Sequence, residues 1–249
     1  MGPESEKYGT LERQTELLKM LKEVDIFFKT NGIVYSLCGG TLLGAVRHNG
    51  FIPWDDDVDL MVDRKNFEKF HTVIENFKGY HLEHELWVDR IRKDDNANSN
   101  IKEATIDIFV FDYCPDRFLL RKIKLIFVML LQGMMHQKIS YKDHSLVMNI
   151  CLTLTFVIGK LFPHNFKYRL YHKFAQIGCG KPQKTLSEYN GLFSTLSNRF
   201  PSDLFENTIN HIFEDTELPI VTKYDEYLTT MYGNYMVPVS ESERVPNHM

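Results

Sequence analysis

Four aspartates stand within five residues of the sequence, immediately before an apolar run. Two of them, Asp57 and Asp59, are two positions apart, and side chains with that spacing point to the same face of a β-strand. Like charges held so close repel each other, and burying them without a partner is costly. A divalent cation relieves this repulsion, and carboxylate oxygens suit Mg²⁺ or Mn²⁺. The spacing therefore predicts one or two divalent ions at the start of a strand.

A third carboxylate, Asp107, stands in the middle of another apolar run, between Ile106 and Ile108. An aspartate in such a run is unfavourable unless something pairs with it. If its strand lies beside the strand of Asp57 and Asp59, the three carboxylates converge on the metal. That arrangement is typical of metal-assisted phosphoryl transfer, so we predict catalytic and metal-binding roles for all three.

A pair of glycines, Gly39 and Gly40, ends a short apolar segment, and Thr41 follows in what is predicted to be a helix. A strand-to-helix turn presents backbone N–H groups to an anion, and the helix dipole favours negative charge there. Arg47, about two turns later, is available to neutralise phosphate. These residues predict a phosphate-binding turn.

Periodicity predicts the elements that must position these residues. Apolar residues at three- and four-residue steps indicate helices, and short apolar runs between turn residues indicate strands. The predicted helices are 11–29, a helix beginning at the glycine turn, and 63–77; the predicted strands are 33–38, 55–62, 80–91 and 104–113. This order predicts a small α/β core near 10–115 and a mostly helical remainder.

Composition places the chain among ordinary globular proteins. Of its 249 residues, 43% are apolar and 25% are charged, which excludes long disorder and fibrous repeats. The net charge is −4, so a general nucleic-acid binder, which needs a basic footprint, is not expected. The four cysteines form no Cys-x-x-Cys pair and lack zinc-finger spacing. Dispersed thiols and the lack of a signal-peptide pattern predict a cytoplasmic protein.

The segment 116–184 differs in composition from the residues before it, because Arg and Lys interrupt its apolar runs. Two interpretations stay open. In the first, 118–131 and 146–162 are buried helices of a second subdomain. In the second, they form an interfacial patch that contacts the inner face of the cell membrane, where it reaches a lipid-linked glycan. The run 146–162 is marginal for a bilayer span.

One long motif resembles a known family. Residues 38–59 read CGGTLLGAVRHNGFIPWDDDVD, which resembles the signature of the LicD family. That family includes bacterial phosphocholine transferases and fukutin-type ribitol-phosphate transferases, and it belongs to the nucleotidyltransferase-fold superfamily. The segments 219–238 and 244–248 look like its C-terminal block and closing basic segment. The segment 116–184 carries no recognisable family signature.

The resemblance implies a fold and a division of the chain. The expected fold class is α/β (α+β), with a nucleotidyltransferase-like mixed sheet flanked by helices and a mostly helical insertion and C-terminal part. The catalytic core is expected at 10–115 and an acceptor-side or membrane-proximal helical segment at 116–184. A C-terminal block at 185–249 is expected to pack on the core.

The resemblance also implies roles for particular residues. Asp57 and Asp59 are expected to bind the metals, and Asp107 to complete the cluster or to act as general base on the acceptor hydroxyl. Trp54 is the candidate for contact with the transferred headgroup, since aromatic faces attract quaternary ammonium groups. The expected nucleotide and phosphate contacts are Gly39, Gly40, Thr41, Gly44, Arg47, Asp55, Asp56, Arg244 and His248.

The implied reaction moves phosphocholine from CDP-choline to a hydroxyl of a cell-surface glycan or teichoic-acid precursor and releases CMP. Related donors, namely CDP-ribitol, CDP-glycerol and CDP-ethanolamine, stay open. Two further alternatives stay open as well: a nucleotidyltransferase acting on a small molecule, and a degenerate member that serves only as a scaffold. The clustered carboxylates argue against a scaffold, because a scaffold does not need them.

Overall fold

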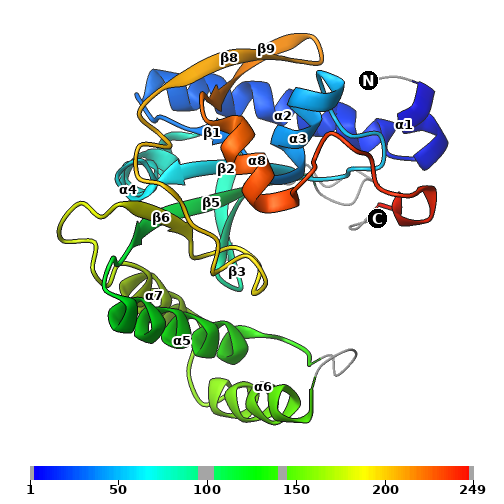
Figure 1. Cartoon of the computed structure of the whole chain (residues 1–249). Coiled ribbons are helices and arrows are strands. Elements are labelled where there is room, and N and C mark those ends of the chain that lie inside the picture. The colour runs from blue at the N-terminus through cyan, green and yellow to red at the C-terminus, as the bar shows by residue number, and fades with distance from the viewer. Residues whose placement is uncertain (1–2, 95–103, 140–144, 247–249) are drawn as a thin grey trace. The chain divides into compact units, whose positions relative to one another are not determined.

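A computed structural model describes residues 3–94, 104–139 and 145–246 of the chain. The chain forms two compact units (Figure 1). Within the described residues, the first unit comprises Met1–Glu83, Asp89–Phe111 and Asp203–Met249, and the second comprises His84–Val88 and Asp112–Ser202. The change of unit after Phe111 lies close to the predicted boundary at 115. Residues 185–202, which we predicted to be part of the C-terminal block, lie in the second unit.

A mixed sheet forms the centre of the first unit, with its main strands in the order β1-β2-β5-β4-β3. These strands are β1 (Ser36–Leu37), β2 (Val58–Asp63), β3 (Tyr80–Glu85), β4 (Val88–Lys93) and β5 (Thr105–Cys114). The central pair, β2 and β5, is parallel, whereas β1 and β4 run antiparallel to β2 and β5. Leu60, Ile106 and Ile108 are fully buried, so the central strands form the core. The predicted mixed α/β fold class is confirmed.

Helices flank this sheet, and all except the first lie where periodicity predicts them. They are α1 (Pro3–Tyr8), α2 (Leu11–Thr30), α3 (Gly39–His48), α4 (Arg64–Val73) and the short η1 (Ile74–Asn76). In α2, Leu17, Leu21, Val24 and Phe28 lie on one face and are fully buried, as their spacing requires. The α4 helix begins after Asp63, whose carboxylate accepts the backbone N–H of Asn66 at 2.7 Å and caps the helix.

The C-terminal part of the first unit contains more strand than we predicted. A hairpin of β8 (Thr208–Phe213) and β9 (Thr216–Val221) precedes α8 (Tyr224–Tyr232) and the short η2 (Glu241–Glu243). Most side chains of β8 are exposed, so the strand lacks the alternating burial pattern that sequence analysis detects. The hairpin joins the core through the N–H of Val221, which donates to Ser36 Oγ at 3.0 Å.

The second unit is mostly helical. Its elements are α5 (Phe118–Met135), α6 (Leu146–Gly159), α7 (His164–Ala175), β6 (Thr185–Glu188) and β7 (Phe200–Pro201). Its core gathers Trp87, Val128, Leu131, Tyr171 and Tyr189. Gln132 is buried in this core and donates to the hydroxyl of Tyr171 and to the carbonyl of Gly191, each at 3.0 Å. The helices predicted around 118–131 and 146–162 are therefore present.

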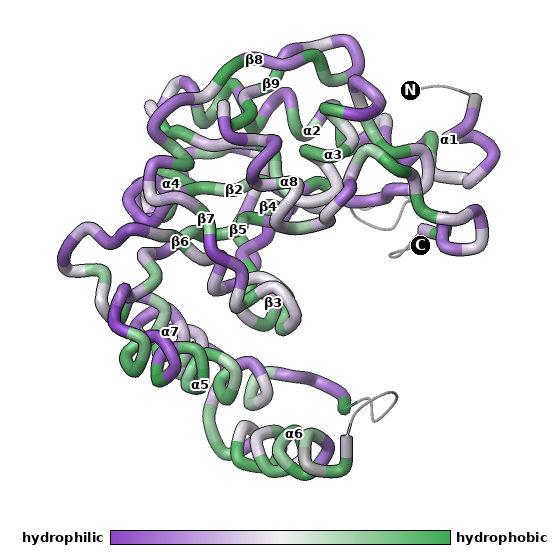
Figure 2. Tube along the Cα trace, in the orientation of Figure 1, coloured by the Kyte–Doolittle hydropathy of each residue, from purple (hydrophilic) through white to green (hydrophobic). Residues whose placement is uncertain are grey.

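The second unit also contains the most apolar helices of the chain. Figure 2 shows that hydrophobic residues dominate α5 and α6. Among the described residues, no helix combines the length and the apolar character needed to span a bilayer.

Candidate active site

The four aspartates that precede and begin β2 differ in how deeply they are buried. Asp55, Asp57 and Asp59 are half-buried, whereas Asp56 is fully buried. Arg13 donates to the backbone carbonyl of Asp56 and helps to hold that residue inside the fold. Asp55, Asp57 and Asp59 are therefore less buried than Asp56, which we predicted to contact nucleotide or phosphate and which lies on the buried side.

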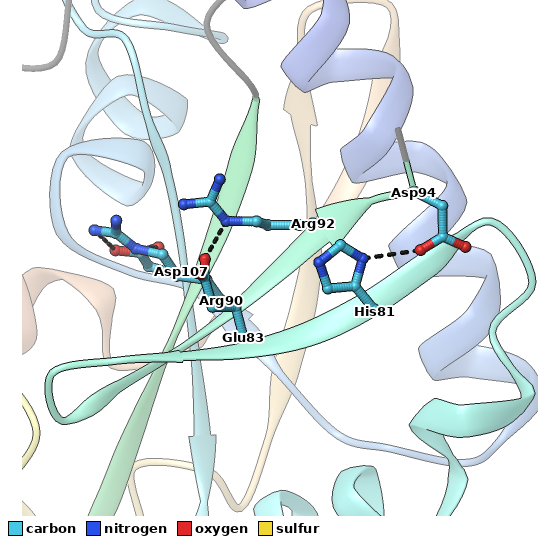
Figure 3. A network of polar contacts seen from close by, with 6 residues as sticks. All are labelled: His81, Glu83, Arg90, Arg92, Asp94 and Asp107. Atoms are coloured by element: carbon cyan, nitrogen blue, oxygen red, sulfur yellow. Dashed lines mark hydrogen bonds and ion pairs between the residues drawn. The ribbon is translucent and has the colours of Figure 1, made fainter. Parts of the chain in front are cut away.

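One row of charged residues crosses three strands. The register of β2 and β5 pairs Asp59 with Asp107, and the register of β4 and β5 pairs Asp107 with Arg90. Residues paired across neighbouring strands share a face of the sheet. Arg90 contacts Asp107 twice, from Nε to Oδ1 at 2.7 Å and from Nη2 to Oδ2 at 3.0 Å (Figure 3). We call Asp59, Asp107 and Arg90 the charged row; it unites two predicted aspartates with a cation that the sequence analysis did not name.

The neighbouring polar pairs on β3 and β4 involve none of the predicted site residues. Arg92 forms an ion pair with Glu83, and His81 Nδ1 lies 2.8 Å from an Asp94 carboxylate oxygen (Figure 3). Among the pairs drawn in Figure 3, only that of Arg90 reaches a predicted catalytic carboxylate.

The glycine turn lies against the aspartates. A Cβ on Gly39 would lie 2.6 Å from Asp59 Oδ2, and a Cβ on Gly40 would lie 2.7 Å from Asp55 Oδ2. Gly39 also has a φ of +55°, which side-chain-bearing residues rarely adopt. The two glycines therefore let the first turn of α3 approach two carboxylates, and negative charge is favoured at that helix end. The N–H of Gly39 donates to the hydroxyl of Tyr227 at 3.1 Å, so α8 also contacts this turn.

Two other predicted contacts serve the scaffold. Thr41 is buried, and its hydroxyl accepts the backbone N–H of Asp59 at 2.9 Å. Gly44 packs so closely on the carbonyl of Gly50 that a Cβ there would collide with it. Both residues hold α3 against the segment that leads to β2, and this explains their place in the motif without a phosphate contact.

Arg47 and Arg244 come close enough to influence each other. Burial and the charge of Arg244 lower the pKa of Arg47. Arg47 donates from Nη1 to the carbonyl of Tyr235 at 3.0 Å, and within the described residues its Nε has no hydrogen-bond partner. Two guanidinium groups that repel each other favour an anion between or beside them. The structure thus brings together two of the predicted phosphate contacts, one from each end of the chain.

Trp54 lies in an aromatic and basic cluster next to the aspartates. Arg244 lies over its ring, with Cζ 5.1 Å from the ring centre. Tyr8 and His48 meet the same indole edge-on, with ring centres 5.7 Å and 6.5 Å away. A cation thus already lies against the aromatic face that we predicted to meet a headgroup. His248 lies outside the described residues.

Asp55 and Asp57 crowd each other. Burial, the charge of Asp57 and a hydrogen bond with Asp57 raise the pKa of Asp55 well above its ordinary value. The charge of Asp56 acts in the same direction. A cation bound at this end of β2 would relieve the repulsion between these two carboxyl groups.

The donor atoms suit a metal ion only in part. Within the described ranges, no set of three His, Cys, Asp or Glu side chains is arranged to hold a metal ion. Asp107 already has Arg90 as its cation. The carboxylates of Asp57 and Asp59 would provide hard oxygen ligands, and a metal ion here would complete its shell with phosphate oxygens and water.

The sequence analysis missed Arg90. Arg90 lies in the predicted strand 80–91, but the register that places it beside Asp107 depends on pairing between distant segments. Tyr227 belongs to the C-terminal motif, which gave no hint of its partner. A cavity of about 420 Å³ in the second unit, lined in part by Arg117 and Lys181, contains none of the predicted site residues.

Comparisons with known proteins cover the residues of the candidate site. Residues 32–130, which contain the glycine turn and all the predicted aspartates, match the family model described as LicD/FKTN/FKRP, nucleotidyltransferase domain. The lipopolysaccharide cholinephosphotransferase LicD of Haemophilus influenzae is 27% identical over 96% of this chain and 95% of that protein.

Two uncharacterized proteins match a shorter stretch. That of Rickettsia typhi is 32% identical over 45% of this chain and 34% of its own length. That of Rickettsia prowazekii is 28% identical over 46% of this chain and 40% of its own length. The family model over residues 32–130 and the nearly full-length match support the assignment of the chain to the LicD family and, with it, to the transferases.

Proposed function

We propose that this chain transfers phosphocholine, or a related phospho-alcohol, from a CDP-activated donor to a hydroxyl of a cell-surface glycan, with release of CMP. The observation that supports this most is the register that sets Asp59 beside Asp107 at a glycine turn. The name of the Haemophilus influenzae relative supports the choice of phosphocholine. A teichoic-acid precursor or a lipopolysaccharide would offer the same acceptor hydroxyl.

In this proposal Asp57 and Asp59 hold Mg²⁺ or Mn²⁺ together with the phosphates of the donor. The metal, when bound, neutralises charge on the bridging phosphate oxygens. The helix that begins at Gly39 adds its dipole at the same point. Asp55, which hydrogen-bonds Asp57, orients that ligand.

Asp107 is the proposed general base. The acceptor hydroxyl attacks the phosphorus that carries the headgroup, a new P–O bond forms, and the P–O bond to CMP breaks. The hydroxyl proton passes to the carboxylate of Asp107. Arg90 fixes the orientation of this carboxylate with two contacts.

Arg47 and Arg244 are proposed to bind the donor phosphates, because their mutual repulsion is relieved by an anion. Trp54 is proposed to contact the headgroup. The guanidinium of Arg244 lies over its ring, and a quaternary ammonium group would be attracted to the same aromatic face. Ribitol and glycerol headgroups carry no such charge, so Trp54 favours choline as the substrate.

A panel of donors tests the proposal. The chain is incubated with CDP-choline, CDP-ethanolamine, CDP-glycerol or CDP-ribitol in the presence of Mg²⁺, and CMP is measured. We expect CMP from CDP-choline, either by transfer or by slow hydrolysis, and a preference for CDP-choline that Trp54→Ala reduces. CMP from none of the four donors contradicts the proposed reaction.

A nucleotidyltransferase is the second candidate, because the matching family model is described by that domain name. Such an enzyme attacks the phosphate that carries the nucleoside and releases diphosphate. Assaying diphosphate with nucleoside triphosphates as donors separates the two reactions, and we expect none to form.

A further inference from the structure

The second unit exposes an extended apolar surface on two packed helices. On α5, Leu119 is 70% exposed and Ile126 is 54% exposed; on α6, Leu146 is 76% exposed and Leu154 is 57% exposed. In both helices the exposed apolar residues recur at three- and four-residue steps, so each helix presents a stripe. The exposed large apolar residues of α5, of α6 and of the turn that follows α6, which we call the α5–α6 face, are Phe118, Leu119, Ile123, Ile126, Phe127, Leu130, Leu146, Ile150, Leu154, Val157, Ile158, Leu161 and Phe162.

The α6 helix is unusual for a helix on a protein surface. It has no charged residue over its 14 positions, and none of its described side chains is fully buried. A helix in water normally turns a polar face to the solvent. The hydroxyls of Thr153 and Thr155 donate to the carbonyls of Asn149 and Cys151, one turn earlier. The polar groups of these threonines are thus satisfied within the helix, which suits an apolar environment.

The two helices form a firmly held pair. Thr155 of α6 packs so closely on Gly133 of α5 that a Cβ on this glycine would collide with it. Gly159 of α6 packs in the same way on the backbone of Met134. Lys167 of α7 ties both helices together, because its ammonium donates to the carbonyl of Met134 at 3.0 Å and to that of Gly159 at 2.9 Å. The apolar side chains are therefore presented by a braced hairpin, and their exposure is a property of the folded unit.

Charge indicates what covers this face. The segment 116–184 holds twelve Lys and Arg against two Asp, a net +10, although the whole chain carries −4; the remaining residues therefore carry −14. Cations adjoin the apolar residues: Lys122 Nζ lies 4.5 Å from the ring centre of Phe118, and Lys160 Nζ lies 4.4 Å from that of Phe156. Two copies of so basic a surface would repel each other, whereas anionic lipid attracts it.

We propose that the α5–α6 face docks on a bilayer that contains anionic lipids, with its apolar stripes in the headgroup region and its cations at the lipid phosphates. At about 1.5 Å per residue, α6 is about 21 Å long, shorter than a hydrocarbon core of about 30 Å, so it lies along the surface. Apolar side chains with Lys and Arg beside them are the pattern of interfacial helices. This inference is independent of the proposed chemistry, because any enzyme with a lipid-linked acceptor would gain from it.

Vesicle co-sedimentation of the full chain tests the proposal. Vesicles of phosphatidylcholine alone are compared with vesicles that also contain phosphatidylglycerol. We expect binding to the anionic vesicles that weakens as salt is added, because surface charges are screened. The double variant Ile126→Glu/Leu154→Glu is expected to lose at least about tenfold in binding, since it places two charges in the apolar stripes.

Ile26→Glu is the matched control, because Ile26 is 64% exposed on α2, a helix of the first unit. It is expected to bind as the unaltered chain does. Circular dichroism and CMP formation from CDP-choline in the absence of vesicles show whether the double variant remains folded and active. Equal binding of the double variant and the unaltered chain would overturn the proposal. So would a dimer of the unaltered chain that the same two substitutions dissociate, since a second copy would then cover the face.

Discussion

At the scale of single residues, the pair of Arg90 and Asp107 is the most informative feature of the candidate site. The side chains are only 22% and 14% exposed, so water screens their charges weakly. Breaking such a pair leaves one charge buried without its partner. Arg90 therefore acts as a positioning residue through Asp107, and both stability and activity depend on it.

We expect Arg90→Gln to lower the free energy of unfolding by about 2 kcal/mol, because Asp107 loses its cation in a mostly buried site. Urea denaturation measures this change. CMP formation should fall as well, since the carboxylate loses the two contacts that orient it.

Arg92→Gln is the control for this prediction. Arg92 lies on the same strand and is 23% exposed, but its partner is Glu83, which is not a site residue. Its loss should leave CMP formation unchanged. If both variants lose CMP formation equally, Arg90 has no special relation to Asp107.

At the scale of elements, the glycine turn brings α3 against the aspartates. We expect Gly39→Ala to lower stability by about 1 to 2 kcal/mol, because its φ of +55° is unfavourable for alanine. The new Cβ would also displace the carboxylate of Asp59, so CMP formation should fall strongly. Thermal unfolding and the donor assay measure the two effects separately.

Gly79→Ala provides the comparison, because Gly79 has a φ of +83° with no atom within 4 Å of the position of a Cβ. Alanine there meets the same kind of backbone strain without touching the site. Its stability should fall by a similar amount while activity is retained. Equal activity losses in the two variants would mean that strain alone matters at Gly39.

Sequence periodicity predicts the elements of the core better than those of the C-terminal part. The helix at 11–29 and the strand at 104–113 agree with α2 and β5, because both have one strongly buried pattern. The exposed hairpin of β8 and β9 lacks such a pattern and was missed. The strand predicted at 33–38 narrows to Ser36–Leu37, since only these residues pair with β2.

Local sequence patterns likewise predict the candidate site only in part. The spacing of Asp57 and Asp59 predicts that they share a face, and the register of β2 and β5 places Asp59 beside Asp107. The cation at Asp107 comes from a different strand, and pairing between distant segments cannot be read from local spacing. Thr41 and Gly44 show a second limit of local patterns. Both belong to the glycine motif and hold α3 in place, so membership of a motif does not by itself identify a ligand contact.

At the scale of the whole molecule, basic, acidic and apolar residues are unevenly distributed along the chain. The basic and apolar stretch 116–184 contrasts with an acidic remainder, so any approach to a charged surface would be oriented. The second unit also buries titratable groups of its own, among them Glu188.

Burial raises the pKa of Glu188 from its ordinary value of 4.5 to about 8. Between these two pH values the folded chain keeps a proton that the unfolded chain releases. The contribution of this group to stability is therefore fully present below about pH 4.5 and is lost as the pH rises towards 8. The loss is at most about 1.4 kcal/mol per pH unit.

Glu188→Gln stays neutral at every pH, so its unfolding midpoint in urea should depend less on pH across this range than that of the unaltered chain. The comparison is the difference between the two profiles, because other groups titrate equally in both. Identical slopes would show that Glu188 does not keep its proton in the folded state.

The central claim is that the aspartates of the candidate site carry out the chemistry, and one assay addresses it directly. The unaltered chain and Asp59→Asn are incubated with CDP-choline and Mg²⁺, and CMP is measured over time. We expect CMP from the unaltered chain, loss of that CMP when Mg²⁺ is chelated, and a decrease of at least about 100-fold in Asp59→Asn with an unchanged fold. Full CMP formation by Asp59→Asn would contradict the account.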